Sequence, residues 1–335
     1  MEDYRDRDVL VVGMARTGIA VAKLLWKLGA NVYINDMKAA DQLGEEIGEL
    51  EKRGIKLFLG SSPDELLEKV DMIVVSPGVP FDLPFITRAI DMGIEVVGEI
   101  ELAYRMELAY RINPNRNIIA ITGTNGKTTT TMLVGEIVKA AGHRVHVVGN
   151  IGVPLIDRVM DIDSGDIVVL EVSSYQLESI DRFKPHIAAI LNITEDHLDR
   201  HKTMENYIRI KGRIFENQDR DDYMVLNADD SRLETFSHNA NDNLVMFSRK
   251  GRVPRGAWVE NGDIVIDIGK GKQRICSYQD LIILGKHNLE NALAAAAIAG
   301  LMEVDADIIS TVLKDFRGVE HRIEYVDTID GVEFY

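Results

Sequence analysis

The sequence predicts an α/β protein with two successive parallel-sheet domains, the second of which carries an antiparallel edge ribbon. Short apolar runs alternate with amphipathic stretches over most of the chain, and a polar segment containing Pro114 interrupts this alternation. A glycine-rich turn follows the first apolar run after that segment. The 335 residues are 46% apolar, enough to bury more than one core. We expect domains at 1–112 and 113–317, then a hinge and strand at 318–335.

The first domain, residues 1–112, is expected to be Rossmann-like, because its strands and helices alternate as in βαβ units. Its first strand-to-helix turn, residues 13–18, has the outline of a dinucleotide fingerprint, and Asp36 ends the next strand where a ribose-binding acid would lie. Ala15 replaces the second glycine of that fingerprint and hinders a pyrophosphate. We therefore favour another nucleotide ligand, or a plain tight turn, over NAD. The expected strands are 9–12, 32–35, 72–76 and 94–97.

A glycine loop between a strand and a helix is the most informative stretch. Residues 118–122 are expected to form a buried strand and Thr128 to begin a helix, so that Gly123-Thr-Asn-Gly-Lys-Thr forms the turn. The two glycines let backbone N–H groups converge on an anion at the helix N-terminus, where Lys127 adds positive charge and Thr128 offers a hydroxyl to Mg²⁺. We predict a phosphate-binding loop. Its spacing is shorter than in GxxxxGK[ST], so it does not indicate a GTPase or a common kinase.

The second domain is therefore expected to be a P-loop ATPase-like α/β domain. Its sheet is expected to be largely parallel, since helices separate the earlier strands. From 243 to 278 the pattern changes to short alternating runs with several glycines, which predicts an antiparallel ribbon at one edge. The expected strands are 118–122, 144–148, 167–172, 187–193 and 224–227, and the last helices are 288–302 and 306–316.

Polar groups end two strands of this second domain. Glu171 ends an apolar strand, and the carboxyl ends of parallel strands face the ligand crevice, so Glu171 is expected to hold Mg²⁺ beside the phosphates. Asp196, His197 and Asp199 follow the next strand. They favour a second cation site or a substrate contact, with helix capping by Asp196 left open.

Three residues on helices carry less information by themselves. From its spacing alone, Lys211 is a surface lysine four residues after Tyr207. Asn288 and Asn291 share a helix face and are suited to hydrogen-bond a base edge, although N-capping explains Asn288 almost as well.

Composition limits the function classes. Against 38 basic residues stand 54 acidic ones, and the net charge of −16 disfavours nucleic acid as a partner. Cys276 is the only cysteine and is expected to be structural. The polar amino terminus and the lack of a long apolar run predict a cytoplasmic protein without a membrane anchor, and we expect a monomer.

Seven segments together resemble the Mur ligases, and the match spans the chain. They are GTNGKTTTT at 123–131, GNIGVP at 149–154, EVSSYQLE at 171–178, LNITEDHLDRH at 191–201, KGRIFENQ at 211–218, GKHNLENALAA at 285–295 and GVEHRIE at 318–324. Within the family, VVGMARTGIA at 11–20, SPGVP at 76–80 and GEIELAYR at 98–105 are similar to the D-glutamate-adding members.

The resemblance implies roles for particular residues. Lys127, Lys211 and His197 would act in catalysis, and Lys211 matches a lysine that CO₂ converts into an anionic carbamate. Two Mg²⁺ ions would be held by Thr128, Glu171, His197 and Lys211. ATP would contact Gly123, Thr124, Asn125, Gly126, Lys127, Thr128, Thr129, Asn288, Asn291 and Arg322. The uridine-linked substrate would contact Arg16, Thr17, Asp36, Met37, Ser76, Asn150, Ser173 and Gln176, with Ala15 and Met37 departing from the family pattern.

The resemblance also implies ATP-dependent joining of D-glutamate to UDP-N-acetylmuramoyl-L-alanine through an acyl phosphate, in peptidoglycan precursor synthesis. It implies a third domain beyond Tyr335, so we expect residues 1–335 to bind nucleotide but to ligate negligibly. Three alternatives stay open: another Mur ligase or a folylpolyglutamate synthase-like ligase, a nucleotide-binding module without catalysis, and an NAD-dependent oxidoreductase.

Overall fold

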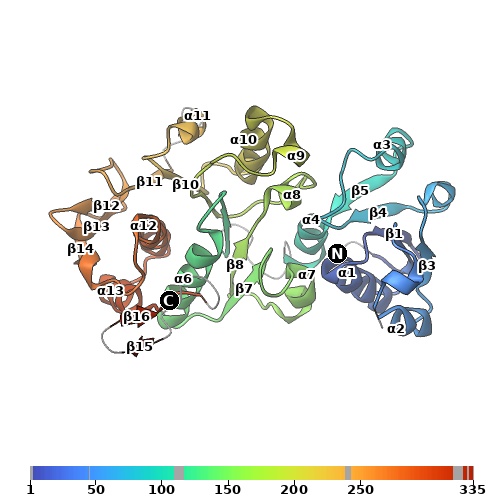
Figure 1. Ribbon diagram of the computed structural model, residues 1–335, viewed down its shortest axis with the longest axis horizontal. Coiled ribbons are helices and arrows are strands. Elements are labelled where there is room, and N and C mark those ends of the chain that lie inside the picture. The colour runs from blue at the N-terminus through green and yellow to red at the C-terminus, as the bar shows by residue number, and fades with distance from the viewer. Residues whose placement is uncertain are drawn as a thin grey trace. The chain divides into compact units, whose positions relative to one another are not determined.

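The computed structural model describes residues 3–44, 46–108, 117–237, 243–319, 327–329 and 332–334. The chain packs as two compact units, both of the predicted α/β class (Figure 1). Within the described ranges, no helix has the length and apolar character needed to cross a bilayer. Unit 1 comprises Met1–Ile112, Gly152–Asp163 and Ser174–Phe183, and unit 2 comprises Asn113–Ile151, Ser164–Ser173 and Lys184–Tyr335.

Unit 1 is built on a five-stranded parallel sheet in the order β3-β2-β1-β4-β5. The strand order reverses between β1 and β4, which in doubly wound sheets is where ligands bind at the carboxyl ends. Residues 9–12 of β1 and all four residues of β4 are buried, as their unbroken apolar sequences predict, and only Asp8 at the start of β1 is partly exposed. The strands are β1 Asp8–Val12, β2 Asn31–Asp36, β3 Lys56–Leu59, β4 Met72–Val75 and β5 Glu95–Gly98.

Two segments from the middle of the chain, 152–163 and 174–183, pack with unit 1. The division predicted from the sequence assigns both to the second domain. They pack here because two buried carboxylates of α4, Glu99 and Glu101, accept their backbone N–H groups. Glu99 Oε1 accepts from Ile156 N at 2.8 Å, and Glu101 accepts from Asp181, Arg182 and Phe183 N at 2.9 to 3.0 Å. The helices of unit 1 are α1 Arg16–Lys27, α2 Glu46–Lys52, α3 Pro84–Asp91, α4 Glu99–Ala103, α7 Leu155–Arg158 and α8 Ser174–Leu177.

Unit 2 is built on a nine-stranded sheet in the order β14-β13-β12-β11-β10-β9-β6-β8-β7. Strand β6 lies between β8 and β9 and is parallel to both, so the segments that follow these three strands meet at one edge. The strands are β6 Ile118–Thr122, β7 Val145–Gly149, β8 Ile167–Glu171, β9 Ile187–Ile190, β10 Tyr223–Asn227, β11 Leu244–Ser248, β12 Gly256–Glu260, β13 Asp263–Asp267 and β14 Gln273–Ser277.

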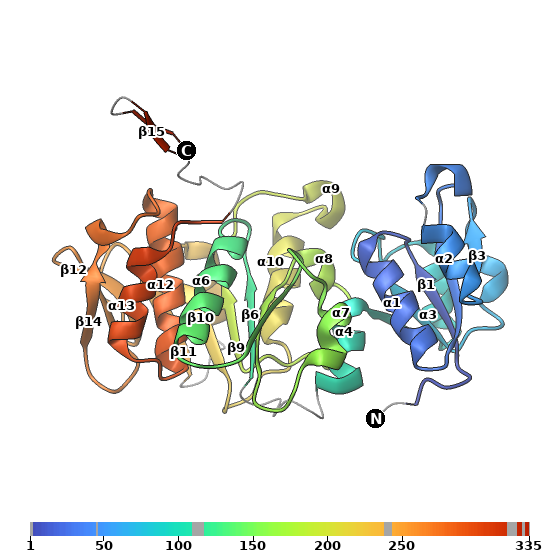
Figure 2. The same cartoon turned by 90° about the horizontal axis from the view of Figure 1, so that it is seen from below.

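The main core of unit 2 lies between this sheet and the helices α6, α12 and α13, which pack side by side over one face (Figures 1 and 2). Its alanine-rich helix α12 is buried without interruption from Asn291 to Ala299, since small side chains allow close approach to the sheet. Cys276 lies in this core, as expected for a structural cysteine. The helices are α6 Lys127–Ala140, α9 Leu198–His201, α10 Met204–Gly212, α11 Glu234–Ser237, α12 Lys286–Leu301 and α13 Ala306–Asp315, and a separate hairpin is formed by β15 Asp327–Ile329 and β16 Val332–Phe334.

The expected antiparallel ribbon is confirmed for β12, β13 and β14, which pair antiparallel at the sheet edge. The prediction was wrong for β11, which pairs parallel with both β10 and β12. Its sequence LVMFS, four apolar residues and a serine, is compatible with either direction, and only the pairing partners decide between them. Strand β3 was not predicted, because this edge strand is only half-buried and its apolar signal is short.

Candidate active site

The glycine loop lies where the sequence predicts it, between the end of β6 and the start of α6. Gly126 has φ +81°, and a Cβ at this position would lie 2.2 Å from Asn291 Oδ1. Glycine is therefore needed here both for the left-handed backbone and for the close approach of α12. Lys127 folds back over the loop and donates from Nζ to Gly123 O at 3.0 Å and to Thr124 O at 2.8 Å.

A hydroxyl and a carboxylate meet beside this loop. Thr128 Oγ1 donates to Glu171 Oε2 at 2.9 Å, and both side chains are almost inaccessible to solvent. Asn150 holds the other carboxylate oxygen, donating from Nδ2 to Glu171 Oε1 at 3.0 Å. Hydroxyl and carboxylate oxygens are the hard ligands that Mg²⁺ prefers, so this pair fits one magnesium ion.

Lys211 is buried, with 1% of its surface exposed, so the expectation of a surface lysine was wrong. That expectation considered only its own helix, α10, whereas the end of β6 covers the side chain. Nζ donates to Gly123 O at 2.9 Å and lies 4.8 Å from the centre of the Tyr207 ring. Burial and, secondarily, the charge of Lys127 lower the pKa of Lys211 to about 7.

His197 lies on the surface of unit 2. Its Nε2 is 3.4 Å from Asp196 Oδ2, and its backbone has a left-handed φ of +53°. In the ranges covered by the structure, no group of three or more His, Cys, Asp or Glu side chains is gathered closely enough to hold a metal ion. In the structure Glu171 therefore contacts Thr128, whereas His197 lies next to Asp196.

The two asparagines of α12 lie beside the glycine loop and are both buried. Asn291 Nδ2 donates to Asn288 Oδ1 at 3.2 Å, and Asn288 Nδ2 donates to Leu284 O at 2.8 Å. Thr130 Oγ1 of α6 donates to Asn291 Oδ1 at 3.3 Å. These bonds fix both carboxamides close to the loop. Arg322 lies outside the described residues.

Unit 1 has its own cavity of about 550 Å³ at the carboxyl edge of its sheet. Asp36 and the exposed Met37 line it, together with Gly13. Asp36 accepts from Met14 N at 2.7 Å and Lys38 N at 2.9 Å, so its carboxylate shapes the turns around it.

The remaining predicted substrate residues are divided between the two units. In unit 1, Ser76 Oγ donates to Gly13 O at 3.0 Å, Arg16 and Thr17 begin α1, and Gln176 is buried in α8. Asn150 and Ser173 belong to unit 2.

Sequence reasoning missed Asn192 and Thr194, which follow β9 and hydrogen-bond to the glycine loop. Tyr207, whose hydroxyl lies 3.2 Å from Thr124 Oγ1, was noted only as a neighbour of Lys211. The segment LNITEDH was recognised, yet only its acids and histidine were weighed, because uncharged side chains give no signal of their own. A strand-end asparagine in the same sheet as a glycine loop was the available clue.

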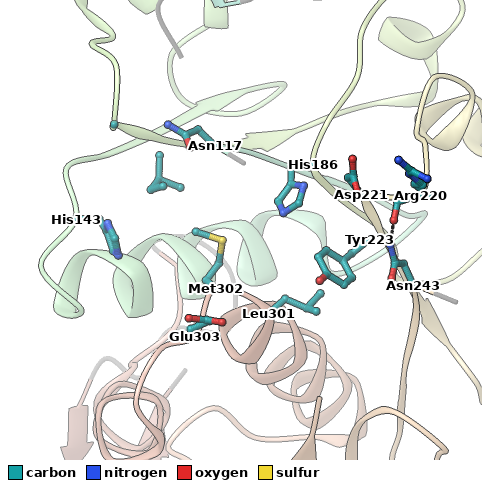
Figure 3. A pocket seen from close by; sticks show the side chains of 12 residues that line it. Asn117, His143, His186, Arg220, Asp221, Tyr223, Asn243, Leu301, Met302 and Glu303 are labelled. Carbon is teal, nitrogen blue, oxygen red and sulfur yellow. Dashed lines mark hydrogen bonds between the residues drawn. The ribbon is translucent and has the colours of Figure 1, made fainter. Parts of the chain in front are cut away.

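Unit 2 has a cavity of about 720 Å³ at the edge of its sheet opposite to the glycine loop (Figure 3). Asn117, His186 and Tyr223, which stand at the starts of β6, β9 and β10, line it. His186 Nδ1 is 3.2 Å from the buried carboxylate of Asp222. Of the residues predicted for catalysis or binding, none that the structure describes lines this cavity.

Comparisons with known proteins agree with the fold of both units. Residues 121–299 match the family described as Mur ligase middle domain. Residues 7–98 match the family described as Mur ligase MurD-like, N-terminal domain. The first match covers the glycine loop, Glu171, Lys211 and both α12 asparagines.

Curated relatives are similar over nearly the whole chain. The UDP-N-acetylmuramoylalanine–D-glutamate ligase of Alkaliphilus oremlandii is 50% identical over 334 residues, which is 99% of this chain and 72% of the relative. The enzymes of the same name from Thermoanaerobacter pseudethanolicus and Clostridioides difficile are 48% and 46% identical, over 99% and 98% of this chain and 72% of each relative.

Solved structures share the fold at lower identity. The UDP-N-acetylmuramate:L-alanyl-gamma-D-glutamyl-meso-diaminopimelate ligase of Neisseria meningitides has a TM-score of 0.62 at 18% identity, covering 94% of this chain and 100% of that one. The murein peptide ligase of Psychrobacter arcticus has a TM-score of 0.58 at 18% identity, covering 98% and 72%. From the two family matches and the curated relatives, we conclude that the chain belongs to the Mur ligase family and is a homologue of its MurD members.

Proposed function

We propose that this protein joins D-glutamate to UDP-N-acetylmuramoyl-L-alanine in an ATP-dependent reaction of peptidoglycan precursor synthesis. One observation carries the proposal: the glycine loop, Lys127 and the Thr128–Glu171 pair form one group at the carboxyl edge of the unit 2 sheet. Such a group is suited to hold a triphosphate and its metal. The relatives, up to 50% identical, are named for this ligation.

The chemistry begins from a carboxylate, which is a poor electrophile. The γ-phosphoryl group passes from ATP to a carboxylate oxygen of the acceptor, breaking the bond to ADP and forming an acyl phosphate. The amine of D-glutamate then attacks the carbonyl carbon, inorganic phosphate leaves, and the amine proton passes to solvent. Lys127 contributes positioning and positive charge for the transferring oxygens, as phosphoryl transfer requires.

Thr128 and Glu171 are the residues we assign to a magnesium ion, with His197 and a modified Lys211 for a second. When bound, Mg²⁺ supplies positive charge that offsets the charge of the phosphate oxygens. Asn150 orients the Glu171 carboxylate through its 3.0 Å hydrogen bond.

We assign to Lys211 the carbamate that the family resemblance implies. A neutral amine attacks CO₂, forming an N–C bond and releasing a proton, so that a buried cation becomes an anion able to face a metal. The lowered pKa of Lys211, about 7, supports this assignment, because the amine is largely neutral at physiological pH.

The uridine-linked substrate is assigned to the cavity of unit 1, where Asp36 and Met37 lie. Arg16, Thr17 and Ser76 surround the same first turn, and Asn150, Ser173 and Gln176 complete the proposed substrate set. The cavity of about 550 Å³ is of a size that accommodates a nucleotide.

Binding of a nonhydrolysable ATP analogue with Mg²⁺, measured by calorimetry, tests the proposal. Lys127→Ala is expected to weaken binding by at least about tenfold, the loss of one or more charge-assisted hydrogen bonds. Lys139→Ala, at the other end of α6 with a side chain 69% exposed, is the matched control and should bind as wild type. Equal affinities of the two variants would contradict the proposal.

Phosphate release with UDP-N-acetylmuramoyl-L-alanine, ATP and D-glutamate tests the reaction itself. We propose that a polypeptide of residues 1–335 binds nucleotide but turns over negligibly, since the relatives are longer than the part matched here. Near-normal turnover would overturn that part of the proposal. Replacing the uridine-linked substrate by a folate tests the alternative of a folylpolyglutamate synthase-like ligase. Such a ligase would bind the folate and would not bind UDP-N-acetylmuramoyl-L-alanine.

A further inference from the structure

The phosphate loop is not held by β6 and α6 alone. The segment Asn192 to Thr194, which follows β9, lies alongside it in unit 2. Thr124 N donates to Asn192 O at 2.9 Å, continuing the pairing of β6 with β9 past the end of both strands. The loop thus has a neighbour that neither charge nor glycine content predicts.

Asn192 forms a reciprocal pair with the backbone of Asn125. Asn125 N donates to Asn192 Oδ1 at 2.8 Å, and Asn192 Nδ2 donates to Asn125 O at 3.0 Å. One carboxamide therefore satisfies both backbone groups of Asn125, which fixes the orientation of the two peptide groups on either side of this residue.

Thr194 extends this contact to the preceding loop residue. Thr194 N donates to Thr124 Oγ1 at 3.0 Å, and Asn125 Nδ2 donates to Thr194 Oγ1 at 3.3 Å. Asn125 is an exposed residue, so these hydrogen bonds restrain a part of the loop that is not held by packing in the core.

Gly123 makes the approach possible. A Cβ at Gly123 would lie 3.1 Å from Leu191 Cβ and 3.4 Å from Asn192 N, so a larger residue would push the two segments apart. Glycine at position 123 therefore allows the close approach of this neighbouring segment.

We infer that Asn192 is a positioning residue for the phosphate loop, with Thr194 in support. It holds the Asn125 peptide in place before nucleotide binds, so that binding does not have to order the loop. This inference rests on the proposed function, and it assigns to Asn192 no contact with the nucleotide.

The test compares Asn192→Ala with Asn227→Ala. Asn227 ends the adjacent strand β10, is buried, and makes an equivalent pair of bonds, to Leu191 O at 3.1 Å and from Asp229 N at 2.9 Å, without touching the loop. Calorimetry measures the affinities of ADP and AMP with Mg²⁺ for each variant. A merely structural residue would change stability, but it would not change the ratio of the two affinities.

For Asn192→Ala we expect ADP binding to weaken about tenfold and AMP binding less than twofold, because the loop serves the terminal phosphates. Asn227→Ala should keep the wild-type ratio even if its melting temperature falls. Thr194→Val provides a second variant: it keeps the backbone bonds and removes one acceptor, and we expect ADP binding to weaken about threefold.

The inference is overturned if Asn192→Ala and Thr194→Val both bind ADP as tightly as the wild type and keep its ratio of ADP to AMP affinity. The proposed function would then remain intact. A wild-type protein that binds no ADP would overturn both.

Discussion

Lys211 offers the sharpest test of the proposed chemistry. With a pKa of about 7, roughly 90% of its amine is neutral at pH 8, whereas an ordinary lysine with a pKa near 10.4 is about 0.4% neutral. The reactive form is thus about 200-fold more abundant at this one side chain. We therefore predict that Lys211 takes up CO₂ selectively and that uptake rises as the pH passes through about 7.

The assay is ¹³C NMR of the protein in ¹³C-bicarbonate, in which a carbamate gives its own resonance. Lys211→Met should abolish the resonance that rises near pH 7. The control is Lys184→Met: Lys184 Nζ lies 3.2 Å from Asp222 and 2.6 Å from Asp219, whose charges favour its protonated form. The control should retain the resonance. A wild-type resonance that persists in Lys211→Met, or that appears only near pH 10, would refute the reasoning.

Three further predictions concern stability and the loop. Burial raises the pKa of the Glu99 carboxyl group to about 7 from 4.5, so the folded state binds the carboxyl proton more tightly than the unfolded state does. The resulting contribution to the free energy of unfolding is complete below about pH 4.5 and is lost as the pH rises through 7. Between about pH 4.5 and 7, the free energy of unfolding of the wild type, measured in urea titrations, should fall by about 3 kcal/mol relative to that of Glu99→Gln. The same dependence of this free energy on pH in both proteins would contradict the prediction. Glu101→Gln removes one of three carboxylates that pair with Arg105 and replaces by an NH₂ group one of the two oxygens that accept the backbone N–H groups of Asp181, Arg182 and Phe183. It should cost about 3 kcal/mol by the same measurement, whereas Glu49→Gln on the surface should cost less than about 1 kcal/mol. Gly126→Ala should abolish ATP binding, because its Cβ would meet Asn291 Oδ1 in a left-handed backbone; wild-type affinity in calorimetry would show that the loop adapts.

Much of the fold follows from local sequence. Unbroken apolar runs such as residues 118–121 identify buried parallel strands, since both faces of such strands need apolar cover. The half-buried β3 and the parallel pairing of β11 were not predictable in this way, because each depends on which strand lies next to it. The packing of 152–163 and 174–183 with unit 1 likewise depends on Glu99 and Glu101, acids that look like ordinary surface residues in the sequence.

The residues of the candidate site also differ in whether the sequence alone could predict them. Gly126, Lys127 and Thr128 were recognisable because they are adjacent in sequence and their chemistry depends on a local turn between strand and helix. The burial of Lys211 was not, since its environment comes from β6 and its own helix shows only an exposed-looking position.

By itself the sequence determined the α/β class, the position of the glycine loop between a strand and a helix, and the family, because each follows from short contiguous patterns or from sequence identity along the chain. Only the tertiary structure decided that Glu171 hydrogen-bonds to Thr128, that Lys211 is shielded from solvent and that Asn192 hydrogen-bonds to the backbone of the glycine loop. The physical reason is that desolvation and side-chain hydrogen bonds depend on neighbours across the sheet, which lie tens of residues away in the chain.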